Sequence, residues 1–249
     1  PGRPARLAAA CSAAGGEEAE GAGRTVRIVA MSDTHGFHRR LLVPEGDVLI
    51  HCGDAAPSGR WGRPAKGADK FEFFARWFAR QPHETKLFVE GNHEREPQVE
   101  QLLSRWRLRG THECFGLRLH GLPYSRDQRY GALPDGLDVL VSHEPPRGVL
   151  DGAYRSLREP EQRRATGSRA LREALAELGS RAPRLHLFGH IHEARGLQRS
   201  TDGTLSANVA NANGGHAKRL VHGCMVFDLA TDGSGRVAFV KQPSPGLKQ

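Results

Sequence analysis

From residue 24 onward the chain alternates short apolar runs with polar turns. Runs of about four to six apolar residues bounded by polar turns are typical of strands that are buried on both faces. Five such runs each end in a polar cluster, and they predict strands over Thr25–Asp33, Asp47–Asp54, Thr85–Glu94, Leu137–Glu144 and Arg184–Glu193. After Gly203 no helical pattern follows, and three more strands are predicted within Leu205–Gly214, Gly223–Ala230 and Gly235–Gln242.

Two segments between these runs have helical periodicity. In the first, aromatic residues recur at helical spacing and Pro82 ends the pattern, which predicts a helix that packs one face on a sheet. The second runs from Ser168 to Leu178 and is followed by Gly179, a common residue after a helix end. Strands that alternate with helices predict an α/β fold. We expect one domain over 25–242, a disordered Ala/Gly-rich tail over 1–24 and a short C-terminal tail over 243–249.

Composition narrows the possible partners. The 249 residues carry 36 Lys and Arg against 28 Asp and Glu, a formal net charge of +8. A basic surface can attract nucleic acid, anionic lipid or a phosphorylated substrate. No zinc finger or RNA-binding signature accompanies the charge, so scattered surface arginines are the favoured interpretation and nucleic acid is the less favoured partner. No apolar run approaches the ~20 residues of a membrane span, so we expect a soluble chain without a membrane partner.

The four cysteines indicate a reducing compartment. They lie far apart and form no CxxC pair, which argues against a thiolate zinc site and against a disulfide framework. We therefore expect an intracellular, cytoplasmic location. The first sixteen residues contain arginine and no acid, which is weakly similar to the end of an organelle-targeting peptide, so an organelle stays open.

Candidate chemistry gathers where the predicted strands end. The polar clusters there contain Asp33, His35, Asp54, Asn92, His93, His143, His190 and His192. Ligands of open α/β sheets bind outside the carboxyl ends of the strands, so we expect these side chains to meet at one edge. Two-residue spacing also puts side chains on the same side of an extended chain, so Asp33 with His35, and His190 with His192, can address one point.

The residue types at these strand ends suit hard or borderline metal ions. Carboxylate, amide and imidazole groups without cysteine match manganese, iron or zinc. The set exceeds what one tetrahedral ion takes, and a carboxylate can bridge, so two divalent or trivalent ions are predicted, with manganese the expected ion in vitro. Two ions ~3.5–4 Å apart can activate a water and clamp the oxygens of a phosphoryl group in an in-line displacement.

The ordered motifs resemble a known family. "MSDTHG", "GDVLIHCGD", "GNHE", "GHIHE" and the closing "NVANAN…MVFDL" are similar to the calcineurin-like metallophosphoesterase superfamily over roughly residues 26–229. Within it the chain looks most like the metallophosphoesterase-domain-containing group of small phosphodiesterases. The resemblance implies a four-layer α/β/β/α sandwich of two mixed β-sheets flanked by helices.

The resemblance also implies a role for each residue. One ion would be held by Asp33, His35, Asp54 and His192, and the other by Asp54, Asn92, His143 and His190. Asp54 would bridge the ions, and it is predicted to be catalytic together with His93, which would protonate the leaving oxygen. Asn92 and His93 would contact the substrate. The implied reaction is hydrolysis of a small-molecule phosphate ester, with cyclic nucleotides or related diesters as the favoured substrates.

Other interpretations stay open from sequence. The same metal pair could serve a protein Ser/Thr phosphatase or a nuclease, and a non-catalytic interaction scaffold is a third possibility. The native metal, the physiological substrate and the oligomeric state do not follow from the sequence.

The remaining histidines and three asparagines divide into groups. His51 and His186 lie within predicted strands and are interpreted as structural, while His83, His112, His120 and His222 are assigned to surface or core. His38 and His216 follow motif-like loops and could reach the site. For Asn208, Asn211 and Asn213, a contact with substrate or ligand and a structural role in turns are equally favoured.

Overall fold

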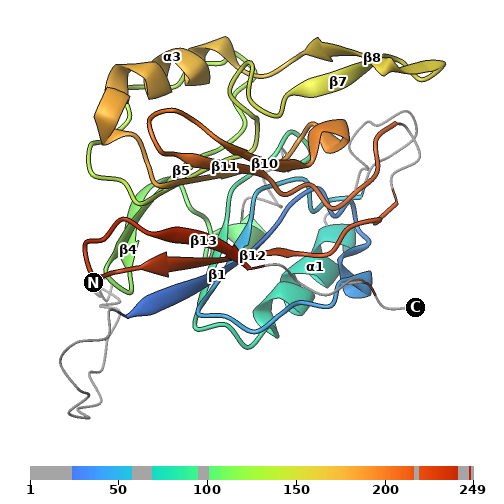
Figure 1. Ribbon diagram of the computed structural model, residues 1–249. Coiled ribbons are helices and arrows are strands. Elements are labelled where there is room, and N and C mark those ends of the chain that lie inside the picture. The colour runs from blue at the N-terminus through green and yellow to red at the C-terminus, as the bar shows by residue number, and fades with distance from the viewer. Residues whose placement is uncertain (1–23, 58–68, 95–100, 216–218, 241–246, 248–249) are drawn as a thin grey trace, which may run out of the picture.

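The computed structural model describes residues 24–57, 69–94, 101–215, 219–240 and 247 (Figure 1). The predicted tails therefore lie outside the described residues except for Arg24 and Leu247, and so does His216. Leu247 forms an isolated antiparallel bridge with Leu41.

The first sheet joins the two ends of the chain. Its strand order is β13-β12-β1-β2-β3. Strands β1, β2 and β3 are parallel, and β12 and β13 add an antiparallel edge. The strands span Thr25–Met31 (β1), Val48–His51 (β2), Thr85–Phe88 (β3), Met225–Ala230 (β12) and Val237–Val240 (β13).

The second sheet is built from the middle of the chain, in the order β10-β11-β9-β6-β5-β4. Its four central strands are parallel and both edge strands are antiparallel. The strands span Gly110–Cys114 (β4), Leu117–Leu122 (β5), Val139–Ser142 (β6), Leu185–Phe188 (β9), Gly196–Arg199 (β10) and Leu205–Asn208 (β11). A separate hairpin pairs β7 (Gly152–Ser156) with β8 (Glu159–Ala165).

The apolar side chains divide the molecule into four layers. Alternate residues of β1, such as Ile28 and Ala30, enter a core that also contains the inner faces of β6 and β9, so the two sheets pack face to face. The intervening Val29 and Met31 instead pack with aromatic side chains of α1 (Asp69–Ala79). Helix α3 (Arg169–Leu178) covers the outer face of the second sheet. The expected four-layer sandwich is confirmed.

The expected strands are all present but shorter than their motifs. Each polar cluster lies beyond its strand: β1 ends at Met31, before Asp33, and β9 ends at Phe188, before His190. Both expected helices also form, and Ser168 caps α3 by accepting a hydrogen bond from the Leu171 amide.

Five strands were not expected from the pattern: β4, β5, β7, β8 and β10. All seven residues of β8 are exposed, and four of the five residues of β7 are partly exposed. Most of β4 and β10 is also exposed, because both are edge strands. Strands without a buried apolar face leave little hydrophobic periodicity to detect.

The topology sets where polar loops meet. Strands β1, β2 and β3 are parallel, as are β5, β6, β9 and β11, so the loops after each set leave from one end of its sheet. The isolated parallel bridge between Ser32 and Ala210 links the segment after β1 to the segment after β11 across the two sheets. Among the described helices, none is long and apolar enough to cross a bilayer.

Candidate metal centre

The loops after the strands turn tightly and are not extended. Four of the predicted site residues have positive φ angles: Asp33 (56°), His35 (43°), Asp54 (58°) and His190 (67°). The expectation that extended backbone aims their side chains is therefore wrong. A non-glycine residue in this region costs about 1–3 kcal/mol and persists only where surrounding structure enforces it.

Backbone hydrogen bonds between two of these loops provide that enforcement. The Asp33 amide donates to Gly53 O (2.9 Å) and the His35 amide donates to Asp54 O (3.0 Å). The loops after β1 and β2 therefore run together as one unit. This pairing places the Asp33, His35 and Asp54 side chains in one buried region.

Asp33, His35 and His192 form the first group of potential ligands. Their candidate ligand atoms lie within 4.8 Å of one another, and all three residues are buried. His192 Nε2 lies 3.0 Å from Asp33 Oδ1 and 3.3 Å from His35 Nε2. The other ring nitrogen of His192, Nδ1, lies 3.0 Å from Asn213 O, which fixes the ring orientation.

Asp54, His143 and His190 form a second group, again with candidate atoms within 4.8 Å. His143 Nε2 lies 3.5 Å from Asp54 Oδ1 and 3.1 Å from His190 Nδ1. Asn92 adds its Oδ1 atom 3.1 Å from the same His143 nitrogen. His143 Nδ1 lies 2.8 Å from Cys52 O, so its Nε2 is the atom turned toward the group.

Asp54 connects the two groups. Its carboxylate also belongs to a third potential ligand set with His35 and His93. The His93 amide donates to Asp54 Oδ1 (3.0 Å), and His93 Nε2 lies 3.7 Å from Asp54 Oδ2. The structure thus brings all eight predicted residues to one place, with His93 beside Asp54 and with His190 and His192 in different groups.

The electrostatics favour protonation states that suit metal ligands. Burial would raise the pKa of Asp33, but the charge and hydrogen bond of His192, with His143 and His35, hold this pKa well below its usual value. Burial, reinforced by His143, lowers the pKa of His190 to about 3. Metal ions need ionised carboxylates and neutral imidazoles, so the donor set fits metal binding.

Glu94, the last residue of "GNHE", has a role that sequence reasoning did not assign. Its buried carboxylate accepts hydrogen bonds from the amides of Asp54 (2.8 Å), Ala56 (2.9 Å) and Gly91 (2.8 Å). Burial, with the charge of Asp54, raises the pKa of Glu94 to about 7, although the three amides oppose this. Glu94 therefore ties the loop after β2 to the loop after β3.

Two glycines are required by close approach. A β-carbon at Gly189 would lie 2.1 Å from Asp33 Oδ2, and one at Gly91 would lie 2.2 Å from Asp54 Oδ1. The glycines that precede "HIH" and "NHE" therefore let the backbone pack directly against the two carboxylates.

The side chains of Asn208 and Asn211 form hydrogen bonds with backbone groups. The Asn211 side chain accepts from the Ser32 amide (3.0 Å) and donates to the carbonyls of His222 and Gly223. Asn208 donates to Ile191 O (2.8 Å). These contacts favour the structural interpretation for both.

The other described histidines do not join the centre. His51 is buried, stacks on Phe88, accepts from the Gly53 amide at Nδ1 and lies 3.1 Å from Thr34 Oγ1 through Nε2. His186 is buried, with Nε2 2.9 Å from Ser142 Oγ, so both are structural as expected. His38 packs on Phe74 and Trp77 of α1, so it does not reach the site. His83 is buried, His120 is half-buried, and His112 and His222 are exposed.

Tyr124 borders the second group and has no sequence signal. It follows β5, and its ring centroid lies 6.0 Å from that of His143 and 5.8 Å from that of His190. The parallel pairing of β5 with β6 and the hydrogen bond from the Tyr124 amide to Glu90 O (2.8 Å) bring it there.

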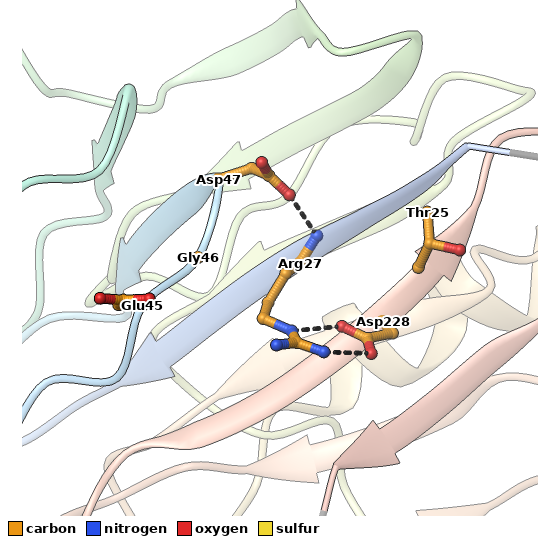
Figure 2. Close-up of a pocket in the computed structure, with 6 residues that line it drawn as sticks. All are labelled: Thr25, Arg27, Glu45, Gly46, Asp47 and Asp228. Atoms are coloured by element: carbon orange, nitrogen blue, oxygen red, sulfur yellow. Dashed lines mark hydrogen bonds and ion pairs between the residues drawn. The ribbon is translucent and has the colours of Figure 1, made fainter. Parts of the chain in front are cut away.

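A separate hollow lies at the opposite end of β1 (Figure 2). Its main feature is the Arg27 guanidinium, which donates two 2.8 Å hydrogen bonds to Asp228. The Arg27 amide donates to Asp47. These charged groups are already paired, and the hollow contains none of the predicted site residues.

Residues 26–194 match the calcineurin-like phosphoesterase family. The chain belongs to this family. The span of this calcineurin-like phosphoesterase that matches the family includes all eight site residues. The curated relatives extend the likeness beyond residue 194.

Metallophosphoesterase domain-containing protein 1 of Homo sapiens is 28% identical, over 82% of this chain and 71% of its own length. A UPF0046 protein of Caenorhabditis elegans is 27% identical, over 82% of this chain and 81% of its own length. The probable rhamnogalacturonate lyase C of Emericella nidulans is 32% identical over 70% of this chain, but this chain spans only 18% of that protein. TT1561 of Thermus thermophilus has a similar fold, with a TM-score of 0.51, 13% identity, and coverage of 87% of this chain and 99% of its own.

Proposed function

We propose that this calcineurin-like phosphoesterase hydrolyses phosphodiesters at a dinuclear metal centre, with cyclic nucleotides or related small diesters as substrates. The observation that supports this most is the arrangement around Asp54. Its carboxylate lies between one group of ligand atoms from Asp33, His35 and His192 and another that includes His143 and His190. A carboxylate with imidazole ligands on both sides suits two ions that share that carboxylate.

Each residue has a role in this proposal. Asp33, His35, Asp54 and His192 would hold one ion, and Asp54, Asn92, His143 and His190 the other. When bound, a metal pair supplies Lewis-acid activation of the attacking water and of the phosphoryl oxygens. Manganese, iron and zinc all fit this mixture of donors.

His93 and Asn92 would act on the substrate. His93 lies at the Asp54 carboxylate, edge-on to His35 with ring centroids 5.0 Å apart. A protonated His93 in this place would neutralise charge on a phosphoryl oxygen and then give its proton to the leaving alkoxide. Asn92 would orient the phosphoryl group through its side-chain amide.

The alternatives differ in substrate or in catalysis. A protein Ser/Thr phosphatase or a nuclease would use the same residues, while an interaction scaffold would keep the fold without turnover. The complete set of ligand types favours a working enzyme. A cytoplasmic location fits the three described cysteines, which are free thiols.

The test is hydrolysis of bis(p-nitrophenyl) phosphate with added Mn²⁺, followed by chelation. We expect activity that the chelator removes. Asp54→Asn should reduce kcat/KM by at least ~100-fold, because it weakens both proposed metal sites. Asp232→Asn, in the exposed turn after β12, is the matched control and should leave activity unchanged. Undiminished hydrolysis by the Asp54→Asn protein would refute the proposed centre.

A further inference from the structure

The β7–β8 hairpin is a part of the molecule that the proposed chemistry does not use. It forms its own two-stranded sheet and projects at the top right of Figure 1, above the short helix η4 (His192–Ala194). The hairpin is rich in arginine, and it contains Arg155, Arg158, Arg163 and Arg164 against the acids Glu159 and Glu161. Its strand β8 is exposed along its whole length.

One arginine fixes the hairpin to the rim of the candidate centre. The Arg163 guanidinium donates a hydrogen bond to Glu193 O, and Glu193 directly follows the potential ligand His192. The same guanidinium lies over the Tyr154 ring, 5.4 Å from its centroid, so it also joins the two strands. The base of the hairpin is therefore attached to the turn that carries His192.

The hairpin also lies along a second segment of that rim, through Tyr154 in β7 and Leu157 in the turn. A β-carbon at Gly214 would be 2.9 Å from Tyr154 Cε2, and one at Gly215 would be 3.3 Å from Leu157 Cδ2. Gly214 follows Asn213, whose carbonyl oxygen lies 3.0 Å from His192 Nδ1. The hairpin thus borders the candidate centre from its base to its turn.

The other three hairpin arginines carry charge that the described structure does not neutralise. Arg155, Arg158 and Arg164 are exposed, and none forms an ion pair with another described residue. Some exposed arginines elsewhere are paired, namely Arg76 with Glu72, Arg181 with Asp135, and Arg236 with Asp232, whereas others such as Arg39 and Arg80 form no ion pair with a described residue. The hairpin arginines are therefore distinguished by their place on an element that borders the candidate centre. Uncompensated guanidinium groups beside a phosphoesterase centre favour phosphate, which they can bind through two parallel hydrogen bonds.

We propose that Arg155, Arg158 and Arg164 bind further phosphate groups of the substrate, beyond the one that is hydrolysed. The inference rests on the proposed function for the reaction and extends its substrate class to diesters that carry a chain of phosphates, such as a short oligonucleotide. A cyclic mononucleotide has one phosphate and would leave these arginines without a ligand.

The experiment compares two 5′-p-nitrophenyl esters, of thymidylate and of trithymidylate, which share a leaving group and differ in phosphate number. The wild-type chain should prefer the trimer by about 10-fold in kcat/KM, and Arg155→Ala/Arg158→Ala/Arg164→Ala should lose this preference. Its activity on the monomer should stay within about 2-fold. Rising salt should lower kcat/KM for the trimer less steeply in the variant. The slope of log kcat/KM against log salt concentration should be smaller in magnitude by about 2, because each of the three lost phosphate contacts contributes ~0.7.

The control is Arg76→Ala/Arg181→Ala/Arg236→Ala, which removes the same charge from arginines outside the hairpin. It should keep the trimer preference. Equal loss in this control would mean that net charge rather than the hairpin attracts the substrate, and it would overturn the inference. Absence of any trimer preference in the wild-type chain would overturn it as well.

A binding measurement separates this inference from the reaction. Fluorescence anisotropy of labelled trithymidylate, without added metal, should show about 10-fold weaker binding to the hairpin variant than to the control. Inorganic tripolyphosphate should displace the probe if phosphates, rather than nucleosides, are recognised. If the wild-type chain hydrolyses neither ester, the proposed function fails, while hairpin-dependent binding still supports this inference. Equal binding by both variants, or no displacement, refutes it.

Discussion

His93 is the residue at which protonation and metal binding can be separated. Its backbone amide, not its ring, makes the 3.0 Å hydrogen bond to Asp54. Removal of the ring therefore leaves this hydrogen bond to the carboxylate in place. We predict that His93→Asn lowers kcat on bis(p-nitrophenyl) phosphate by at least ~100-fold, the usual contribution of a general acid.

Metal analysis of the same His93→Asn protein should find the wild-type metal content. His112→Asn, on the exposed face of the edge strand β4, is the control and should have wild-type kcat. A His93→Asn protein that lost its metal would assign His93 to the ligands instead.

The site residues could be predicted because each is adjacent to an apolar strand in the sequence. Asp33, His35 and Asp54 come directly after buried strands, and they do meet. The backbone conformation was not predictable, because left-handed φ angles at Asp33 and His190 depend on hydrogen bonds between distant loops. Tyr124 was missed for a related reason: its position depends on which strands pair.

At the scale of elements, His186 links neighbouring strands of the second sheet. His186 in β9 lies 2.9 Å through Nε2 from Ser142 Oγ in β6, and that hydroxyl donates to Glu144 O (2.7 Å). Since the hydroxyl proton is used there, Nε2 carries the proton of the neutral ring and donates it. Burial lowers the pKa of His186 to about 3, so the folded chain keeps this ring neutral.

This neutral ring should make the sheet sensitive to acid. In the unfolded chain His186 takes up a proton near its ordinary pKa of 6.5, whereas the folded chain resists protonation down to about 3. Stability from this residue is therefore present above pH 6.5 and is lost as the pH falls toward 3. Urea unfolding gives the free energy of unfolding at pH 7 and at pH 5. The loss of this free energy between the two pH values should be about 2 kcal/mol smaller in His186→Asn than in wild type.

The His112→Asn protein should keep the wild-type difference between pH 7 and pH 5. An unchanged difference in His186→Asn would contradict the assigned neutral state. Both variants can be compared at pH 7 first, which separates the loss of packing from the loss of pH dependence.

Four of the five strands that escaped prediction, β4, β7, β8 and β10, are exposed or partly exposed, whereas β5 buries Leu117 and Leu119. Strand β8, "EPEQRRA", is entirely exposed, so it has no buried face to leave a pattern. The two long helices were predictable because α1 and α3 each bury one side against a sheet. Apart from β5, the elements that can be predicted from the sequence are therefore those that bury an apolar face.

At the scale of the whole molecule, the candidate centre depends on both sheets. Asp33, His35 and Asp54 follow strands of the first sheet, while His143, His190 and His192 follow strands of the second. A bound metal would therefore act as a clamp between the two halves of the sandwich. Anything that binds only the folded chain stabilises it in proportion to its saturation.

Mn²⁺ at about 100 times its dissociation constant should raise the melting temperature by roughly 5–10 °C. Differential scanning fluorimetry with and without EDTA measures this shift. Asp54→Asn should lose most of it and Asp232→Asn should keep it. An equal shift in both variants would show that Mn²⁺ stabilises the chain from some other place.

The division of the ligands between two sheets also sets an order of events in time. The two proposed ion sites each take ligands from both sheets: Asp33 and His35 lack His192, and His143 and His190 lack Asp54, although His35, Asp54 and His93 all follow strands of the first sheet. The full ligand set of either proposed ion site would therefore form only when the sheets have packed face to face. Stopped-flow refolding with a metal-sensitive dye should detect metal uptake after secondary structure has formed. The time of uptake would then report when the two sheets pack against each other.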